Sequence, residues 1–309
     1  MARLNEFLGE EFRAHESFIH ELLVHIARYR GKQLRPACLF LSAQAVGGDV
    51  TDDHVKCAAV VELIHTATLV HDDLLDDAKI RRRVETVNQR WGERAAILLG
   101  DYIYSRGFTL STEVDGVSGL LASTTHTICE GELLQVGSAF DVELTEERYN
   151  EIILKKTAIL YVMACRLGAQ LSGGSEEMQD ALDAYGQAIG MAFQIADDAL
   201  DLVGDENVVG KSLGSDLQKG KLTLPLILLR KILTGGKLEE YLWLLKTPHA
   251  QGAQVRVLRM LRESDVLPTV RRRAVEHVRE AMTKLEVLGD HPVRGSFEAL
   301  SRFVVEREL

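Results

Sequence analysis

The chain has 309 residues, 46% of them hydrophobic, so it is long enough to bury a sizeable core in one large domain or two small ones. Its formal net charge of -10 argues against a general nucleic-acid-binding protein. No apolar run reaches the length of about 18 residues that a membrane-spanning helix needs, and the acidic segment from Met1 to Phe18 lacks the apolar core of a secretory signal. We therefore expect a soluble, cytoplasmic protein.

Apolar residues recur at helical spacing through almost the whole chain, and strand-like alternation is absent over any useful length. Glycines and prolines mark the breaks between the expected helices. These breaks fall at residues 31, 47–48, 92, 115–116, 173–174, 204–220, 235–236, 248, 268 and 289–292. The pattern predicts about ten or more helices, and several of them carry start signals, such as those at Thr51 and Ser175. Because no linker rich in Pro, Gly or Ser separates them, we expect one all-α domain over residues 1–309.

The cysteines at positions 38, 57, 129 and 165 are scattered, and no two have the Cys-x-x-Cys spacing. Most of them lie in apolar helical runs. We therefore expect buried thiols in a reducing compartment.

The segment Gly31-Lys32-Gln33-Leu34-Arg35-Pro36 places two cations at an expected helix start. Backbone N–H groups without intrahelical partners also favour an anion at such a place. Taken alone, a basic helix start is more often only charged surface.

The stretch from Val60 to Asp77 is an apolar helical run that ends in four aspartates, and three arginines follow at residues 81–83. Asp72 and Asp76 share one helix face, and His65 lies two turns earlier on nearly the same line. Two carboxylates about 4 Å apart repel each other by roughly 1 kcal/mol in water and roughly 4 kcal/mol at a half-buried site. Protonation, full exposure or a bound cation would relieve this repulsion. Alone, the cluster would more often be an acidic helix end in solvent, and His65 a core histidine.

A second apolar helical run, from Tyr185 to Asp205, ends in the same way, with Asp197 and Asp198 paired and Asp201 one turn later. Two helices with matched acidic ends can face each other across a cavity. Carboxylate oxygens suit Mg²⁺, which typically takes one or two carboxylates plus substrate phosphates. The repeated pattern therefore favours a metal site over two unrelated acidic helix ends.

With these motifs the chain resembles the trans-isoprenyl diphosphate synthases, also called polyprenyl synthases, from about Gly31 to about Pro225. The resemblance rests on six motifs that occur in the family's order. They are Gly31–Pro36, Asp72-Asp73-Leu74-Leu75-Asp76, Arg81-Arg82, Lys156-Thr157, Phe193-Gln194-Ile195-Ala196-Asp197-Asp198-Ala199-Leu200-Asp201, and Gly210-Lys211 through Gly220-Lys221. It implies a single-domain antiparallel bundle of long helices around a deep central cavity, usually as a homodimer.

The resemblance also implies Mg²⁺ as cofactor and two substrates, isopentenyl diphosphate and an allylic diphosphate. The aspartates expected to hold the metal directly are Asp72, Asp76 and Asp197, with Asp73 and Asp201 acting through water or hydrogen bonds. The residues expected to bind isopentenyl diphosphate are Lys32, Arg35 and His65, assisted by Arg82. The residues expected to bind the allylic diphosphate are Arg81, Lys156, Thr157, Gln194, Lys211 and Lys221. The residues expected to be catalytic are Asp72, Asp76, Arg81, Lys156, Asp197 and Lys211.

The expected reaction follows from charge. Departure of diphosphate from an allylic carbon leaves a delocalised carbocation, and Mg²⁺ stabilises the leaving oxygens as a Lewis acid. The double bond of isopentenyl diphosphate then attacks, and a proton is lost. The resemblance implies that the released diphosphate takes this proton, so we assign no side-chain base.

Product length is expected to depend on the residues just before the first aspartate motif. In the family, bulky aromatics there close the pocket and stop chain growth early. Here Ala67 and Thr68 are small, with Ile64 one turn deeper, and the run Ala122-Ser123-Thr124-Thr125 on a neighbouring helix is also small. The resemblance is therefore to long-chain synthases of quinone side chains, although small residues also serve close helix packing.

Two features fall outside the family pattern. The chain reads Arg81-Arg82-Arg83-Val84-Glu85-Thr86 where members commonly have Arg-Arg-Gly-x-Pro-Thr, so the turn after Arg82 should differ. Farther on, Arg271-Arg272-Arg273 is a charge run, most often a solvated face, which could also touch anionic lipid.

Three alternatives remain at this point. The product could stop at farnesyl or geranylgeranyl length. A terpene cyclase would use the same metal helices, although it has no need for the Lys32, Arg35 and His65 set. A regulatory subunit of a heteromeric synthase is disfavoured because both aspartate motifs are complete.

Overall fold

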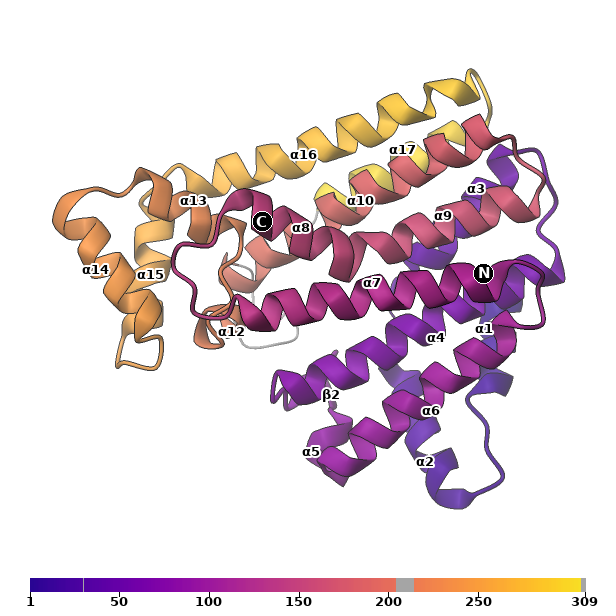
Figure 1. Ribbon diagram of the computed structural model, residues 1–309, viewed down its shortest axis with the longest axis horizontal. Coiled ribbons are helices and arrows are strands. Elements are labelled where there is room, and N and C mark those ends of the chain that lie inside the picture. Colours follow the sequence, from indigo (N-terminus) through magenta and orange to yellow (C-terminus); the bar gives the residue numbers. More distant parts are fainter. Residues whose placement is uncertain (30, 204–213, 307–309) are drawn as a thin grey trace. The chain divides into compact units, whose positions relative to one another are not determined.

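The computed structural model describes residues 1–29, 31–203 and 214–306, and helices dominate these residues (Figure 1). The prediction of an all-α fold is confirmed. A small antiparallel hairpin departs from it, because β1 (Ile80–Arg81) pairs with β2 (Val84–Glu85). Strands of two residues are too short for an alternation pattern to reveal.

Contacts divide the chain into two compact units. The first unit comprises residues 1–124, 160–186 and 285–297, and the second comprises residues 125–159, 187–284 and 298–309. The prediction of one domain over the whole chain stays a prediction.

In the first unit the chain forms several helices around the hairpin. They are α1 (Ala2–Glu11), α2 (Ser17–Ile26), η1 (Ala27–Tyr29), α3 (Leu34–Ala45), α4 (Asp52–Leu75), α5 (Val87–Trp91), α6 (Glu93–Ser111), most of α9 (Ile159–Leu171), η3 (Leu285–Leu288), and the first parts of α7 (Val117–Gly137), α10 (Glu176–Val203) and α17 (Arg294–Val305).

The second unit contains the remaining parts of α7, α10 and α17 together with shorter helices. They are α8 (Glu146–Ile153), the π-helical turn η2 (Leu154–Ala158), α12 (Ser215–Gln218), α13 (Leu224–Ile232), α14 (Gly235–Lys246), α15 (Ala253–Arg262) and α16 (Val266–Lys284). Its apolar core includes Ile195 and Leu202 of α10, Tyr241 of α14 and Val257 of α15.

Helix α4 is the central element of the first unit. It is apolar nearly all round and packs along α6, with α3, α1 and α5 also against it (Figure 1). The predicted start at Thr51 is confirmed, because its hydroxyl accepts the backbone N–H of His54 in a capping box. The helix ends at Leu75, so its last turn carries the first aspartate motif.

Helices α3 and α9 approach each other backbone to backbone at Gly168. A Cβ placed there would overlap the carbonyl oxygen of Leu39 and lie 2.8 Å from Cβ of Ser42. Only glycine lets the two helices pack this closely.

Three of the four cysteines, Cys38, Cys57 and Cys165, are buried free thiols as expected, but Cys129 is exposed. The expectation was wrong for Cys129 because the apolar stretch around it does not decide which helix face a given residue occupies. Among the described residues, no helix has the length and hydropathy needed to cross a membrane.

Replacing Gly168 with Ala should lower the free energy of unfolding by about 1–3 kcal/mol, because the new methyl group overlaps the backbone of α3. Gly119→Ala in α7 is the matched control, since nothing lies within 4 Å of a Cβ at that position. That control should be neutral or stabilise by up to about 1 kcal/mol. Denaturant unfolding measures both, and equal effects of the two substitutions would contradict the close approach at Gly168.

Candidate functional site

The first aspartate motif lies at the C-terminal end of α4, with Asp76 as the C-cap residue. A helix C-terminus already carries partial negative charge, so carboxylates there are unfavourable without cations nearby. Asp72 and Asp76 are half-buried, whereas Asp73 is 1% exposed. Burial raises the pKa of the Asp73 carboxyl to about 6, although the neighbouring Arg81 lowers it.

Arg81, in β1, is the partner of Asp73. Its Nε donates to Asp73 Oδ1 at 2.7 Å, and the arginine side chain is only 28% exposed. The other carboxylate oxygen of Asp73 is buried without a hydrogen-bond partner among the described residues. The first motif is therefore tied to the hairpin that follows it.

The hairpin turns through Arg82 and Arg83, and both have positive φ, at 50° and 66°. Such a turn normally contains asparagine or glycine, because other side chains are strained there. This is the segment in which the sequence departs from the family pattern, and a turn that differs from that of the family stays a prediction.

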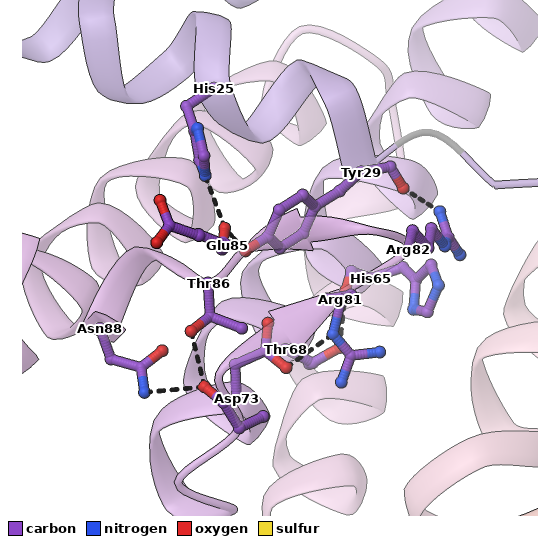
Figure 2. A network of polar contacts seen from close by, with 11 residues as sticks. His25, Tyr29, His65, Thr68, Asp73, Arg81, Arg82, Glu85, Thr86 and Asn88 are labelled. Carbon is purple, nitrogen blue, oxygen red and sulfur yellow. Dashed lines mark hydrogen bonds and ion pairs between the residues drawn. The ribbon is translucent and has the colours of Figure 1, made fainter. Parts of the chain in front are cut away.

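Contacts from η1 and α2 hold the hairpin (Figure 2). His25 Nε2 lies 2.8 Å from the carbonyl oxygen of Glu85, and the Tyr29 hydroxyl donates to the same oxygen at 3.2 Å. The Arg82 guanidinium donates to the carbonyl of Tyr29. A Cβ on Gly31 would overlap this guanidinium, so glycine makes the space for it.

The cations expected to bind isopentenyl diphosphate lie in the same unit. Lys32 is exposed just before α3, and Arg35 is in the first turn of α3, with its guanidinium carbon 4.5 Å from the ring centre of Tyr161. His65, on α4, lies near enough to Arg35, Arg82 and Arg81 for their charges to lower its pKa. Burial, reinforced by these positive charges, lowers the pKa of His65 well below its usual value of 6.5. Burial and the nearby guanidinium groups therefore both favour the neutral form of the His65 imidazole.

The residues expected to set product length differ in exposure. Ile64 and Ala67 are fully buried, and Ile64 Cδ1 lies 3.1 Å from a Cβ placed at Gly107 of α6. Thr68 is half-buried and donates to the carbonyl oxygen of His65 at 2.8 Å. Of the three, Thr68 alone has accessible surface.

In the second unit, Lys156 and Thr157 lie in the π-helical turn η2, a local widening often found at functional sites. The backbone of this turn packs on α7 at Gly131, where a Cβ would lie 2.5 Å from the Lys156 nitrogen. The Lys156 ammonium pairs with Glu132. With its amide oxygen turned toward them, Gln135 accepts from Lys156 Nζ and Lys221 Nζ, each at 3.3 Å.

The end of α10 carries the second aspartate motif, and a hydrogen-bond chain runs beside it. Thr157 Oγ1 donates to Gln194 Oε1 at 2.9 Å, and Gln194 Nε2 donates to Asp198 Oδ1 at 2.7 Å. The Tyr149 hydroxyl donates to Asp198 Oδ2 at 2.6 Å. The Gln194 amide contacts Asp198, because residues four apart meet on a helix, and its role as an orienting group beside the metal site stays a prediction.

The remaining predicted site residues of this part of the chain are Asp197, Asp201, Lys211 and Lys221. Asp197 is half-buried, and Asp201 is 1% exposed and accepts the backbone N–H of Asp216 at 3.2 Å. Burial raises the pKa of Asp198 to about 8. Lys221 is half-buried, and Lys211 lies outside the described residues.

The donor set fits a hard cation completed by substrate. Within residues 1–29, 31–203 and 214–306, no group of three or more His, Cys, Asp or Glu side chains is arranged to hold a metal by itself. Mg²⁺ needs no such cage, because it commonly takes one or two carboxylates and fills its octahedron with water and phosphate oxygens. In the first unit, Asp72 and Asp76 on one face of α4 are two carboxylates of this kind, and in the second unit Asp197 on α10 is one.

Several residues beside these motifs are not among the predicted site residues, namely Tyr149, Glu132, Gln135, His25 and Tyr29. Asp198 belongs to the second motif but has no predicted role of its own. The sequence held one usable signal, the four-residue spacing of Gln194 and Asp198. The other contacts join residues distant in sequence, so no local pattern marks them.

The charge run at residues 271–273 is exposed on α16. Arg273 pairs with Glu146 at 3.4 Å and Glu276 at 3.5 Å, and Arg272 contacts Thr269 at 3.0 Å. These contacts agree with a solvated face, and lipid contact stays a prediction.

Comparison with known proteins places the chain in a family. A family model described as polyprenyl synthetase matches residues 16–258. An octaprenyl diphosphate synthase of Escherichia coli is 34% identical over 310 residues, covering 100% of this chain and 96% of that protein. A geranylgeranyl diphosphate synthase of Methanosarcina mazei is 38% identical over 285 residues, covering 90% of this chain and 86% of that protein. A solved polyprenyl synthase from Caulobacter crescentus, complexed with calcium and isoprenyl diphosphate, has a TM-score of 0.94 at 33% identity and covers 100% of this chain and 95% of that one. The chain therefore belongs to the polyprenyl synthetase family of trans-prenyltransferases.

Proposed function

We propose that this prenyltransferase uses Mg²⁺ to condense isopentenyl diphosphate with an allylic diphosphate and builds a long all-trans polyprenyl diphosphate. One observation carries the proposal. In the first unit, the carboxylates at the end of α4 lie beside a guanidinium group suited to a diphosphate, because Arg81 pairs with Asp73, the neighbour of Asp72. In the second unit, Thr157, which follows the cation Lys156, donates to Gln194, one turn before Asp197 on α10.

Isopentenyl diphosphate binds in the first unit and the allylic diphosphate mainly in the second. The residues proposed for isopentenyl diphosphate are Lys32, Arg35, His65 and Arg82. The residues proposed for the allylic diphosphate are Arg81, Lys156, Thr157, Gln194, Lys211 and Lys221. Guanidinium and ammonium groups hold diphosphate oxygens by charge-assisted hydrogen bonds, and the neutral His65 adds one N–H donor.

The residues proposed as metal ligands are Asp72 and Asp76 in the first unit and Asp197 in the second, with Asp73 and Asp201 supporting the ligands of their own unit through water or hydrogen bonds. When bound, Mg²⁺ supplies a Lewis acid that neutralises the charge developing on the leaving diphosphate oxygens. Arg81 and Lys156 hold the same diphosphate as its bond to the allylic carbon breaks. The carbocation is captured by the double bond of isopentenyl diphosphate, and the released diphosphate accepts the proton.

A long product is supported by the small residues before the first aspartate motif. Thr68 is the half-buried member of the set Ile64, Ala67 and Thr68. The relatives named above include an octaprenyl and a geranylgeranyl diphosphate synthase, so the shorter product is the second candidate.

A homodimer in the cytoplasm remains part of the proposal. Support for the dimer comes from α6, where Ile97, Leu98 and Tyr102 are 45%, 68% and 41% exposed. Large apolar side chains grouped on one helix are typical of an interaction surface.

The function is tested by incubating the purified protein with farnesyl diphosphate, labelled isopentenyl diphosphate and Mg²⁺. Chromatography should show an all-trans product longer than geranylgeranyl. A product no longer than geranylgeranyl would establish the second candidate instead. A protein that is inert alone but active with a partner chain would indicate a regulatory subunit.

Asp72→Asn should lower kcat by roughly a thousandfold, because losing a metal contact removes several kcal/mol of transition-state stabilisation. Its melting temperature should not fall, since the substitution relieves repulsion at the end of α4. Asp77→Asn is the control: Asp77 belongs to the same cluster but is exposed, and its positive φ of 47° suits asparagine. A near-normal rate for Asp72→Asn would refute the metal assignment.

Thr68→Phe should shorten the product by one or more prenyl units, because the ring extends from the half-buried face of α4. Ala67→Phe is also expected to shorten it, but it forces bulk into a fully buried position at about 1–3 kcal/mol. Leu69→Phe places the same ring on a different face and serves as control. Product analysis with no change for Thr68→Phe would show that another residue limits chain growth.

The imidazole of His65 should remain neutral at pH 6.5, where half of the histidines in an unfolded chain are protonated. The folded pKa lies below the unfolded one, so this residue contributes stability above pH 6.5 that is lost as the pH falls through the folded pKa. A nitrogen-detected NMR titration of the folded protein measures this directly, with the protein in denaturant as reference. A folded pKa at or above 6.5 would disprove the neutral donor assigned to His65.

A further inference from the structure

We propose that Tyr149 is a positioning residue for the allylic diphosphate: acting through Asp198, it fixes the amide of Gln194 and the hydroxyl of Thr157. This inference rests on the proposed function. It adds a residue that contacts no substrate itself and that no motif marks.

The hydrogen-bond chain has one direction. An amide nitrogen only donates hydrogen bonds, so Asp198 Oδ1 accepts from Gln194 Nε2 at 2.7 Å, and Asp198 Oδ2 accepts from the Tyr149 hydroxyl at 2.6 Å. The contact with Asp198 forces the Gln194 amide to present its nitrogen on that side. Its oxygen then faces Thr157, whose hydroxyl donates to it at 2.9 Å.

This arrangement leaves the Gln194 amide ready to donate to an anion. Gln194 keeps a second Nε2 hydrogen that can reach a diphosphate oxygen, and its side chain is half-buried. Rotation of the amide by 180° would turn its oxygen toward Asp198, and two acceptors would then repel each other. The orientation of Gln194 therefore depends on Asp198 remaining in place.

Tyr149 keeps Asp198 in place from outside α10. Tyr149 is on α8 and 3% exposed, and Asp198 is 5% exposed, so water cannot easily replace the phenol hydroxyl. Without that hydroxyl, Oδ2 loses its donor in a buried place, which is unfavourable. The carboxylate then takes its second hydrogen bond from the other Gln194 hydrogen, which removes the donor meant for substrate.

Tyr241 provides a matched control in the same unit. It is fully buried on α14, and its hydroxyl donates to the carbonyl oxygen of Leu226 at 2.8 Å. Its loss removes one buried hydrogen bond, as the loss of the Tyr149 hydroxyl does, but it is not part of the hydrogen-bond chain to Gln194.

The test compares Tyr149→Phe with Tyr241→Phe. Tyr149→Phe should raise KM for farnesyl diphosphate about tenfold, which corresponds to about 1.4 kcal/mol. It should leave KM for isopentenyl diphosphate within about twofold, because that substrate is assigned to residues of the first unit. Tyr241→Phe should change neither KM by more than about twofold, even if it lowers the melting temperature as much.

A second measurement does not use turnover. Inorganic diphosphate with Mg²⁺ should raise the melting temperature of the wild type and of Tyr241→Phe by more than that of Tyr149→Phe. Adding Tyr149→Phe to Gln194→Ala should have little further effect on KM, because Tyr149 acts through Gln194.

Three results would overturn the inference while leaving the prenyltransferase intact. The first is an equal increase in KM for both substrates in Tyr149→Phe. The second is an equal effect of Tyr149→Phe and Tyr241→Phe on KM for farnesyl diphosphate. The third is a full further tenfold increase in that KM when Tyr149→Phe is added to Gln194→Ala. A wild-type protein that transfers no prenyl group from farnesyl diphosphate would instead overturn the proposed function, and this inference with it.

Discussion

Repulsion among the carboxylates at the C-terminal ends of α4 and α10 is the constraint on which the site depends. Each charge there opposes the helix dipole by about 0.3–1 kcal/mol, in addition to repelling its neighbours. The fold satisfies some of these groups itself: Arg81 pairs with Asp73, and the backbone N–H of Asp216 meets Asp201. Asp72, Asp76 and Asp197 are the more accessible members, and a divalent cation is the partner that suits them.

In the hairpin after α4, two residues have a strained backbone conformation, and nearby side chains hold them in it. Arg82 and Arg83 adopt positive φ, a conformation that costs of order 1–3 kcal/mol for each residue without glycine's freedom. Hydrogen bonds from His25 and Tyr29 to Glu85, and from Arg82 to Tyr29, offset that strain (Figure 2). The result is a rigid support that holds Arg81 on Asp73. Side-chain contacts from α2 and η1 hold this segment, which lacks the glycine and proline of the pattern common in the family.

In the second unit, the side chains of the proposed site are held by contacts of a different kind. Its cations are paired before any substrate arrives, since Lys156 contacts Glu132 and both Lys156 and Lys221 face Gln135. Its buried carboxylate Asp198 is satisfied by neutral donors from α8 and α10. These donors fix the geometry of the Asp198 side chain, whose pKa burial raises to about 8. Pre-set side chains of this kind reduce the reorganisation needed when a diphosphate binds.

The sequence by itself determined the helical class, the helix starts at Thr51 and Ser175, and the two acidic helix ends, because these depend on local spacing and capping. Through the family resemblance, the sequence also assigned the cations at residues 32–35 and 81–82 to substrate binding. Only the tertiary structure decided which acids are buried, that Gln194 contacts Asp198, that Ile64 packs toward Gly107, and that Cys129 is exposed. Exposure and hydrogen-bond partners depend on segments far apart in the chain, such as α8 against α10 or η1 against β2. Local periodicity carries no information about such contacts.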